Sequence, residues 1–289
     1  MAGTYDQFIA FGTDNAGLER ILRLFQSLFQ ILTSYPLLIA TLLPTSPPAI
    51  HISAETSLRQ LQSRLAITRR WLRLFRFLDA FRGGWQLYLS EAKTLETWLD
   101  AHAKTCLGMY GLLESVTLLD LLDVDHLEVF GRERAASLNV DAQRFWFAAL
   151  YLSAMSSAVK LVRLLAYRPV PPTGDGFAMG GAGLGGKGSG EKDGALVSGE
   201  DKSDLEKIKE EREKRKRQQK EWAKKVSGEM GALGMKLLSD MLDLVIPASI
   251  VGWIQVDPGL VGLAMFCSTI ITGNDVWRRH GRQLAKEQA

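Results

Sequence analysis

The feature that most constrains the fold is a long apolar stretch near the C-terminus, Leu244 to Thr272, whose only strongly polar side chains are Gln255 and Asp257. Such a stretch must be buried within the protein or in a lipid bilayer. Pro247 and the pair Asp257-Pro258 interrupt it, and each half after that break is too short to cross a bilayer alone. Two arrangements therefore stay open: one kinked helix that crosses the membrane, or two short helices that form a re-entrant hairpin.

Other features near this stretch also suggest a membrane. A second uncharged segment, Phe145–Val159, is closed by Lys160 and Arg163, whose long side chains could reach the polar boundary of a bilayer. The C-terminal tail is basic and is expected on the cytosolic side by the positive-inside rule. Small residues allow helices to approach closely in a membrane. The glycines with this expected packing role are Gly252, Gly259 and Gly262.

The spacing of apolar residues at three and four positions predicts an all-α protein, with amphipathic helices followed by one or more C-terminal membrane-embedded helical segments. The expected helices before the C-terminal region are Leu18–Leu32, Ser57–Phe81, two helices within Trp85–Asp123, and Asp141–Tyr167. Gly83-Gly84 is expected to end the second of them.

Composition divides the chain further. A Pro/Gly-rich run at 169–199 predicts a flexible linker, and the charged run after it predicts a solvated helix at 200–233. The expected organisation is thus an N-terminal helical region at 1–168, the linker, the charged helix, and a C-terminal membrane segment with a basic tail at 234–289. The net charge of +3 is no larger than the surplus carried by Glu200–Lys225, so the sequence gives no general basic footprint for nucleic acid.

The first predicted helix is strongly amphipathic. Its apolar residues share one half of the helical wheel, and polar residues such as Glu19 and Arg23 fill the other half. The apolar positions of this face are Leu18, Ile21, Leu22, Phe25, Leu28, Phe29 and Leu32. This face is expected either to contact a membrane or to face the core of a helical bundle.

The second predicted helix places a basic arc opposite an aromatic and leucine-rich arc, an arrangement typical of helices that lie in a bilayer interface. The residues expected to insert into the membrane are Leu65, Trp71, Leu74, Phe75, Leu78 and Phe81. Those expected to bind lipid headgroups are Arg69, Arg70, Arg73 and Arg76. A packed bundle helix with a solvated arginine face, or an RNA-binding arginine helix, would produce a similar pattern.

The residues give little support for catalysis. The glycines at 181–186 satisfy G-x-G-x-x-G, but no strand precedes them and no helix start follows at once, so we interpret them as a spacer. The histidines lack metal-site spacing, and Cys106 and Cys267 lie far apart. We therefore expect no enzyme, no cofactor and no metal site.

Several segments match a recognisable family pattern. They are Phe8–Phe29 with Gly17-Leu-Glu-Arg-Ile-Leu-Arg23, Leu65–Phe81, Leu112–Asp120, Phe145-Trp146, and most specifically Asp240–Pro247, Gly259–Leu263 and Ser268–Gly273, ending at Trp277. On these residues the sequence resembles the peroxin-eleven family of peroxisomal membrane proteins, in a form like that of filamentous fungi. It departs from the familiar members in its long glycine-rich and charged insert, Gly174–Lys225.

The resemblance implies a non-enzymatic protein of the peroxisomal membrane that inserts an amphipathic helix into the cytosolic leaflet, elongates the organelle and promotes its proliferation and fission. It also implies a homo-oligomer and recruitment of dynamin-type fission machinery, while the basic arc of the second predicted helix indicates an anionic phospholipid membrane as partner. A helical adaptor that presents the charged helix to protein partners, or a membrane pore for small metabolites, is the alternative function.

Overall fold

The computed structural model describes residues 3–42, 48–91, 93–122, 128–166 and 199–287. These residues form helices and no strand, which confirms the all-α class. By its internal contacts the chain divides into two compact units, Met1–Lys160 with Leu233–Ala289, and Leu161–Ala232.

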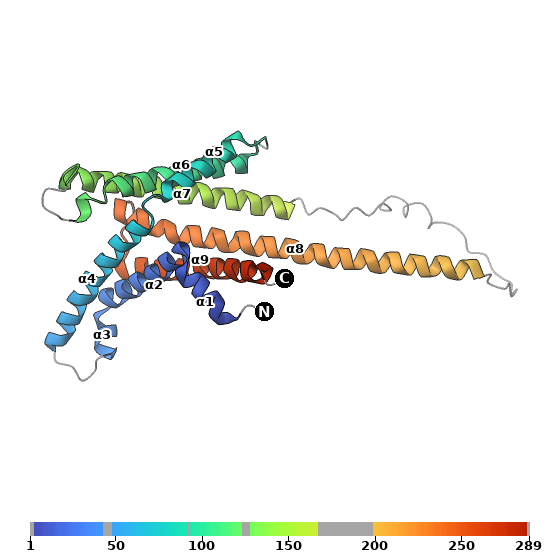
Figure 1. Cartoon of the computed structure of the whole chain (residues 1–289), viewed down its shortest axis with the longest axis horizontal. Helices are drawn as coiled ribbons and strands as arrows, with labels where there is room; N and C mark the ends of the chain where they lie inside the picture. The colour runs from blue at the N-terminus through green and yellow to red at the C-terminus, as the bar shows by residue number, and fades with distance from the viewer. Residues whose placement is uncertain (1–2, 43–47, 92, 123–127, 167–198, 288–289) are drawn as a thin grey trace. The chain divides into compact units, whose positions relative to one another are not determined.

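The larger unit holds most of the helices (Figure 1). In chain order these are α1 (Thr4–Thr13), α2 (Asn15–Ser34), α3 (Pro36–Leu42), α4 (Pro48–Leu72), α5 (Arg76–Leu89), α6 (Leu95–Val116), the short 3-10 helix η1 (Asp120–Leu122), α7 (Arg132–Ala166) up to Lys160, α8 (Gly199–Val251) from Leu233, and α9 (Pro258–Glu287).

Three helix pairings organise this unit. Helix α2 packs against α9 and α4, and α5 packs against α6. The end of α2 lies beside the start of α9, where the Tyr35 hydroxyl donates a hydrogen bond to Asp257 at 2.9 Å. At the other end of α9, the Gln7 side chain of α1 donates to the carbonyl of Trp277 at 2.8 Å. Helices α2 and α9 are therefore antiparallel.

The second predicted helix differs from the structure in where it breaks. Helix α4 ends at Leu72, and i→i+3 hydrogen bonds such as Arg73 N–H to the Arg70 carbonyl (3.1 Å) mark the break before α5. Helix α5 then continues through Gly83-Gly84, so the prediction that these glycines end the helix is wrong. Gly84 is buried, and a Cβ there would lie 3.1 Å from the Thr105 hydroxyl of α6. This glycine provides close helix packing instead of a helix end.

The C-terminal apolar stretch forms two helices. Helix α8 passes through Pro247 and ends at Val251, and Gly252 adopts a positive φ of 84° in the turn that follows. Helix α9 begins at Pro258. Within the described residues, α7 and α9 are each long and apolar enough to cross a membrane. Helices α2 and α3, bent by 98° at Tyr35, are apolar enough together to form a broken span or a re-entrant loop.

The smaller unit contains the charged part of α8. The described side chains at 213–225 are mostly exposed, and the helix continues from the charged region into the apolar region without interruption. The predicted linker at 169–199 lies, apart from Gly199, outside the described residues.

Candidate membrane-contacting surface

Helix α2 turns its polar side toward the protein interior. Glu19, Arg23 and Ser27 are 3%, 4% and 0% exposed, whereas Phe25 on the apolar side is 47% exposed. A helix on the surface of a soluble domain shows the opposite arrangement, because water accepts the polar face and the core accepts the apolar one. The amphipathicity of α2 therefore fits a helix whose outer side faces lipid.

Glu19 is the centre of a buried ion-pair cluster between α2 and the end of α4. Arg69 Nη2 lies 2.7 Å from Glu19 Oε1, and Arg73 Nη1 lies 3.6 Å from the same oxygen. The Gln26 side-chain carbonyl accepts a further hydrogen bond from Arg69 at 2.5 Å. Because a buried charge is costly without partners, these contacts fix α4 against α2.

Glu114 of α6 receives the next arginines along the chain. Arg73 Nη2 donates to Glu114 Oε1 at 2.8 Å, and Arg70 Nε lies 3.4 Å from that oxygen. The Tyr110 hydroxyl also donates to Glu114, at 3.1 Å. Burial raises the pKa of Tyr110 to about 12, so the phenol keeps the proton that it donates. Arg73 thus connects α2 to α6 through two carboxylates.

A second buried pair joins α2 to two further helices. Arg23 of α2 donates to Asp243 Oδ1 of α8 at 2.5 Å and to the Ser268 hydroxyl of α9 at 3.3 Å. Both charged side chains are at most 10% exposed. The contact connects helices that are far apart in sequence, which the sequence analysis did not anticipate.

These contacts involve three of the four arginines that are predicted to bind lipid headgroups. The side chains of Arg69, Arg70 and Arg73 are 9%, 18% and 20% exposed and are paired with carboxylates of the same chain. In this structure they are not on a free basic surface. The partners Glu19 and Glu114 lie on other helices, so helical spacing within one segment could not reveal them. Arg76, at the start of α5, is exposed.

The predicted inserting residues separate into two groups. Trp71, Phe75 and Leu78 are 44%, 68% and 56% exposed, and we call them the junction surface because they surround the break between α4 and α5. Phe81 packs inward instead: a Cβ at Gly108 of α6 would lie 2.6 Å from its ring. The remaining members, Leu65 and Leu74, are partly buried.

The predicted apolar side of α2 lies toward the outside. Leu18 and Phe25 are exposed, and the other members are partly buried: Ile21, Leu22, Leu28, Phe29 and Leu32.

The three glycines for which the sequence predicts a packing role, Gly252, Gly259 and Gly262, have two different roles. A Cβ at Gly259 would lie 2.4 Å from the Tyr35 ring, and a Cβ at Gly262 would lie 3.0 Å from Ile31 Cγ1. Both glycines therefore allow α9 to approach α2 closely. A Cβ at Gly252 would meet nothing within 4 Å, and this glycine instead supplies the positive φ of the turn.

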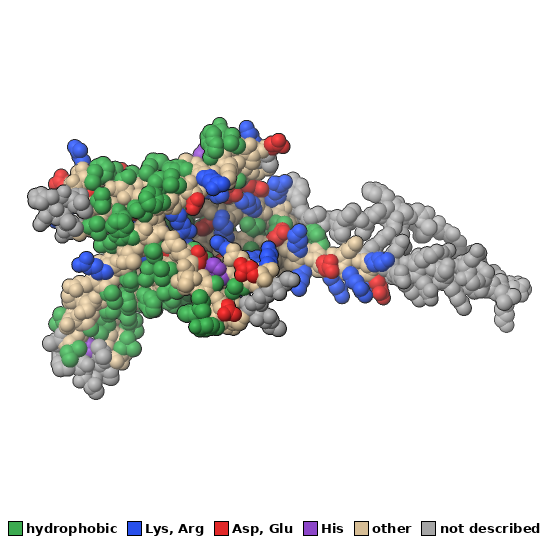
Figure 2. Space-filling view, viewed as in Figure 1, with side chains coloured by type: hydrophobic (Ala, Val, Ile, Leu, Met, Phe, Trp, Pro, Cys, Tyr) green, Lys and Arg blue, Asp and Glu red, His purple; other side chains and the backbone are tan. Residues whose placement is uncertain are grey.

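The exterior of the larger unit carries many large apolar side chains. Phe8, Leu37 and Tyr151 are 59%, 81% and 51% exposed, while alanine is the commonest buried apolar residue. Figure 2 shows apolar side chains over the outer faces, with basic and acidic side chains gathered in the recess at the middle of this view. A soluble monomer rarely exposes so much apolar surface.

The described residues offer little for a cofactor. No group of three or more His, Cys, Asp or Glu side chains among them could hold a metal ion. Cys106 and Cys267 are free thiols.

Polar groups within, apolar groups outside, and helices long enough to span a bilayer together define a helical membrane protein. The model of the family Peroxisomal biogenesis factor 11 (PEX11) matches residues 5–277, nearly the whole chain. The chain belongs to this family, as the resemblance on its residues predicted, and it is a peroxisomal membrane protein of peroxisome proliferation. The family is one of biogenesis factors and not of enzymes. No curated protein and no solved structure gives a significant match.

Proposed function

We propose that this protein elongates and remodels the peroxisomal membrane by inserting the junction surface into one leaflet. The observation that supports the proposal is the exposure of Trp71, Phe75 and Leu78 beside a buried ion-pair cluster. Apolar side chains that enter one leaflet occupy area there, and the difference in area between the leaflets favours curvature.

The buried arginines have a supporting role in this mechanism. Arg69 and Arg73 hold the end of α4 against Glu19 and Glu114, so the junction surface projects from a fixed base. The exposed Arg76 is the member of the predicted basic group that is free to meet anionic headgroups. A basic side chain near such a surface contributes about 1 kcal/mol.

The test uses the full-length chain reconstituted in vesicles that contain phosphatidylserine. We expect the double variant Phe75→Ser/Leu78→Ser to lose most of its tubulating activity, scored by electron microscopy at equal protein density. A matched control, Ile52→Ser/Leu61→Ser, removes apolar side chains that are 69% and 46% exposed on α4, away from the junction. Equal tubulation by the two double variants would contradict the proposal.

We also propose that the protein acts as a homo-oligomer, that dynamin-type fission machinery is its partner, and that its basic tail faces the cytosol. The tail carries Arg278, Arg279 and Lys286 after the candidate span in α9, which favours the cytosolic side. An epitope placed after the last residue should be removed by protease added to intact peroxisomes. Protection of the epitope until the membrane is lysed would reverse the orientation.

Chemical cross-linking in the native membrane, with and without the junction variants, would test the oligomer separately from curvature. We expect cross-linked species to persist in Phe75→Ser/Leu78→Ser, because these changes remove lipid contacts and leave the transmembrane helices intact. Only monomer in the unaltered protein would contradict the oligomer.

A further inference from the structure

An exposed aromatic cluster lies at the turn between α5 and α6, at the opposite end of α5 from the junction surface. The rings of Trp85 and Tyr88 are stacked with centroids 5.7 Å apart, and Trp98 meets Tyr88 edge-on, also at 5.7 Å. These side chains are 62%, 52% and 40% exposed, and Leu89 beside them is 63% exposed. Tyr and Trp combine an apolar ring with a polar group, so they favour a boundary between lipid and water.

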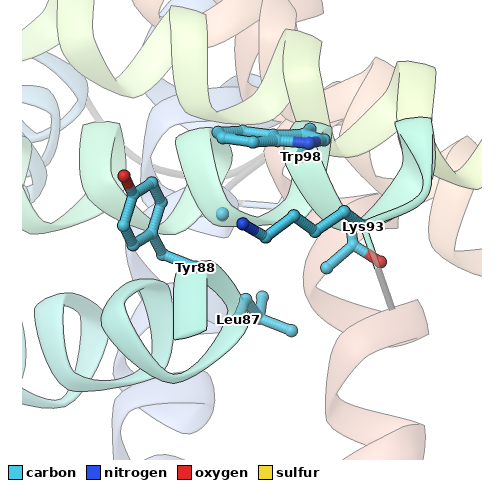
Figure 3. Close-up of a pocket in the computed structure, with 6 residues that line it drawn as sticks. Leu87, Tyr88, Lys93 and Trp98 are labelled. Carbon is cyan, nitrogen blue, oxygen red and sulfur yellow. The ribbon is translucent and has the colours of Figure 1, made fainter. Parts of the chain in front are cut away.

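A lysine occupies the middle of this cluster. Figure 3 shows the Lys93 side chain extending between the Tyr88 and Trp98 rings, with Leu87 below it. Lys93 is exposed, and it forms no ion pair with any residue that the structure describes. We call Trp85, Tyr88, Lys93 and Trp98 the turn cluster. The positive charge of Lys93 suits an anionic lipid headgroup, and the aromatic rings suit the glycerol layer beneath that headgroup.

The position of the turn relative to α7 supports this interpretation. The Ser156 hydroxyl of α7 donates to the Glu96 carbonyl at 3.4 Å, and Lys160 forms an ion pair with Asp100. Lys160 is the first charged residue after the uncharged segment of α7, which is a candidate span. The start of α6 therefore lies where α7 leaves its apolar segment.

Helix α8 becomes polar beside the same part of α7. Lys236 Nζ donates to the Ser153 hydroxyl at 2.8 Å and to the Ser157 hydroxyl at 3.3 Å, and Asp240 accepts from Ser153 at 2.7 Å. Asp100, Lys160 and Lys236, on α6, α7 and α8, thus lie beside the end of the uncharged segment of α7, as expected near the polar boundary of a membrane.

We propose that the turn cluster docks in the headgroup layer of the membrane, with Lys93 against the phosphate of an anionic phospholipid and the aromatic rings at the glycerol level. A second copy of the chain is the competing occupant. The lysine at the centre of the cluster favours an anionic lipid over a second copy of the chain. The position of the cluster beside the end of the uncharged segment of α7 also favours lipid. This docking is separate from the curvature mechanism, because it concerns the other end of α5.

The depth of the turn cluster in the membrane can be measured in the full-length chain after both native cysteines are replaced by alanine. A cysteine at Leu89, labelled with an environment-sensitive fluorophore, is read against lipids with shallow or deep spin labels and against an aqueous quencher. We expect the shallow label to quench most strongly. A control label at Gln218, on the exposed charged part of α8, should respond mainly to the aqueous quencher.

Three outcomes of the depth measurement would overturn the proposal. The first is aqueous quenching at Leu89 equal to that at Gln218. The second is stronger quenching by the deep label than by the shallow one. The third is shielding that appears only at high protein density, which would identify a second copy as the occupant. None of these results would alter the tubulation expected of the junction surface.

Variants of Lys93 test the proposed contact with an anionic headgroup. The same shallow label is carried on phosphatidylserine or phosphatidylcholine, and the ratio of their quenching at Leu89 reports local enrichment of the anionic lipid. We expect Lys93→Gln to reduce this enrichment up to about fivefold, and Lys93→Arg to retain it. Lys224→Gln makes the same charge change on the exposed charged part of α8 and should have no effect on enrichment at Leu89. Unchanged enrichment in Lys93→Gln would refute the headgroup contact.

Discussion

The pair Arg23 and Asp243 shows how individual residues hold this protein together. Each charge is almost fully enclosed, and the pair connects α2 to α8 while Ser268 adds a contact to α9. Enclosure makes the pair costly to form but still more costly to break, because one partner left alone is a buried and uncompensated charge. Its role is therefore to define which helices meet.

We expect Arg23→Met and Asp243→Asn each to destabilise the protein by about 3–5 kcal/mol. The double variant should lose clearly less than the sum, because neither charge is then stranded. Unfolding of the purified chain in detergent micelles, followed by circular dichroism, measures all members of the cycle. Strict additivity of the two losses would show that the residues do not act as a pair.

At this scale the sequence indicates which kind of side chain lies on each face of a helix. It does not indicate which residue of another helix pairs with it. The opposed arcs that contain Trp71 and Arg69 could be predicted from helical spacing alone. That Glu19 would pair with Arg69 could not, because the two lie 50 residues apart on different helices and meet only through packing. The same spacing fits a helix facing headgroups and a helix facing a buried carboxylate.

At the scale of helices, glycines decide how closely neighbours approach and where the chain turns. Gly83-Gly84 looks like a terminator in sequence, yet α5 runs through it because α6 packs against Gly84. Gly252 does accompany a helix end, through its positive φ. Sequence analysis predicted the helical content and the apolar C-terminal segment, but it could not distinguish these two uses of glycine, since only tertiary contacts separate them.

Gly259 and Gly273 on α9 provide a matched comparison. We expect Gly259→Ala to destabilise by about 1–3 kcal/mol, because its Cβ would meet the Tyr35 ring, which is held by a hydrogen bond to Asp257. A Cβ at Gly273 would meet nothing within 4 Å, so Gly273→Ala should be neutral or stabilise by up to about 1 kcal/mol. Thermal unfolding in the same micelles tests both, and an equal shift in the two variants would argue against close packing of α9 on α2.

At the scale of the whole molecule, an apolar exterior surrounds an interior of small and charged residues. Ala142, Ala149 and Ser156 on α7 and Gly262 and Ser268 on α9 are buried. Val261 and Met265 of α9 form a small buried apolar cluster with Ile246 of α8, but other large apolar residues of α7 and α9 are exposed, among them Tyr151, Met155, Leu260, Leu263 and Ile270. Hydrophobic burial within the protein alone would favour the reverse arrangement. The fold is therefore completed by a bilayer, and retention in the membrane should depend on the outward residues of α9.

Leu263 and Gln255 test this dependence. Leu263 is 41% exposed within the candidate span of α9, and Gln255 is exposed in the turn before it. An Arg at mid-bilayer costs about 2.5–3.5 kcal/mol, whereas each Leu, Ile, Val or Phe returns only about 0.3–0.6. Leu263→Arg should therefore outweigh several apolar neighbours, release the chain during carbonate extraction and disturb its peroxisomal localisation. Gln255→Arg should remain anchored because it adds charge where the chain is already polar, and equal behaviour of the two variants would show that α9 is not the embedded helix.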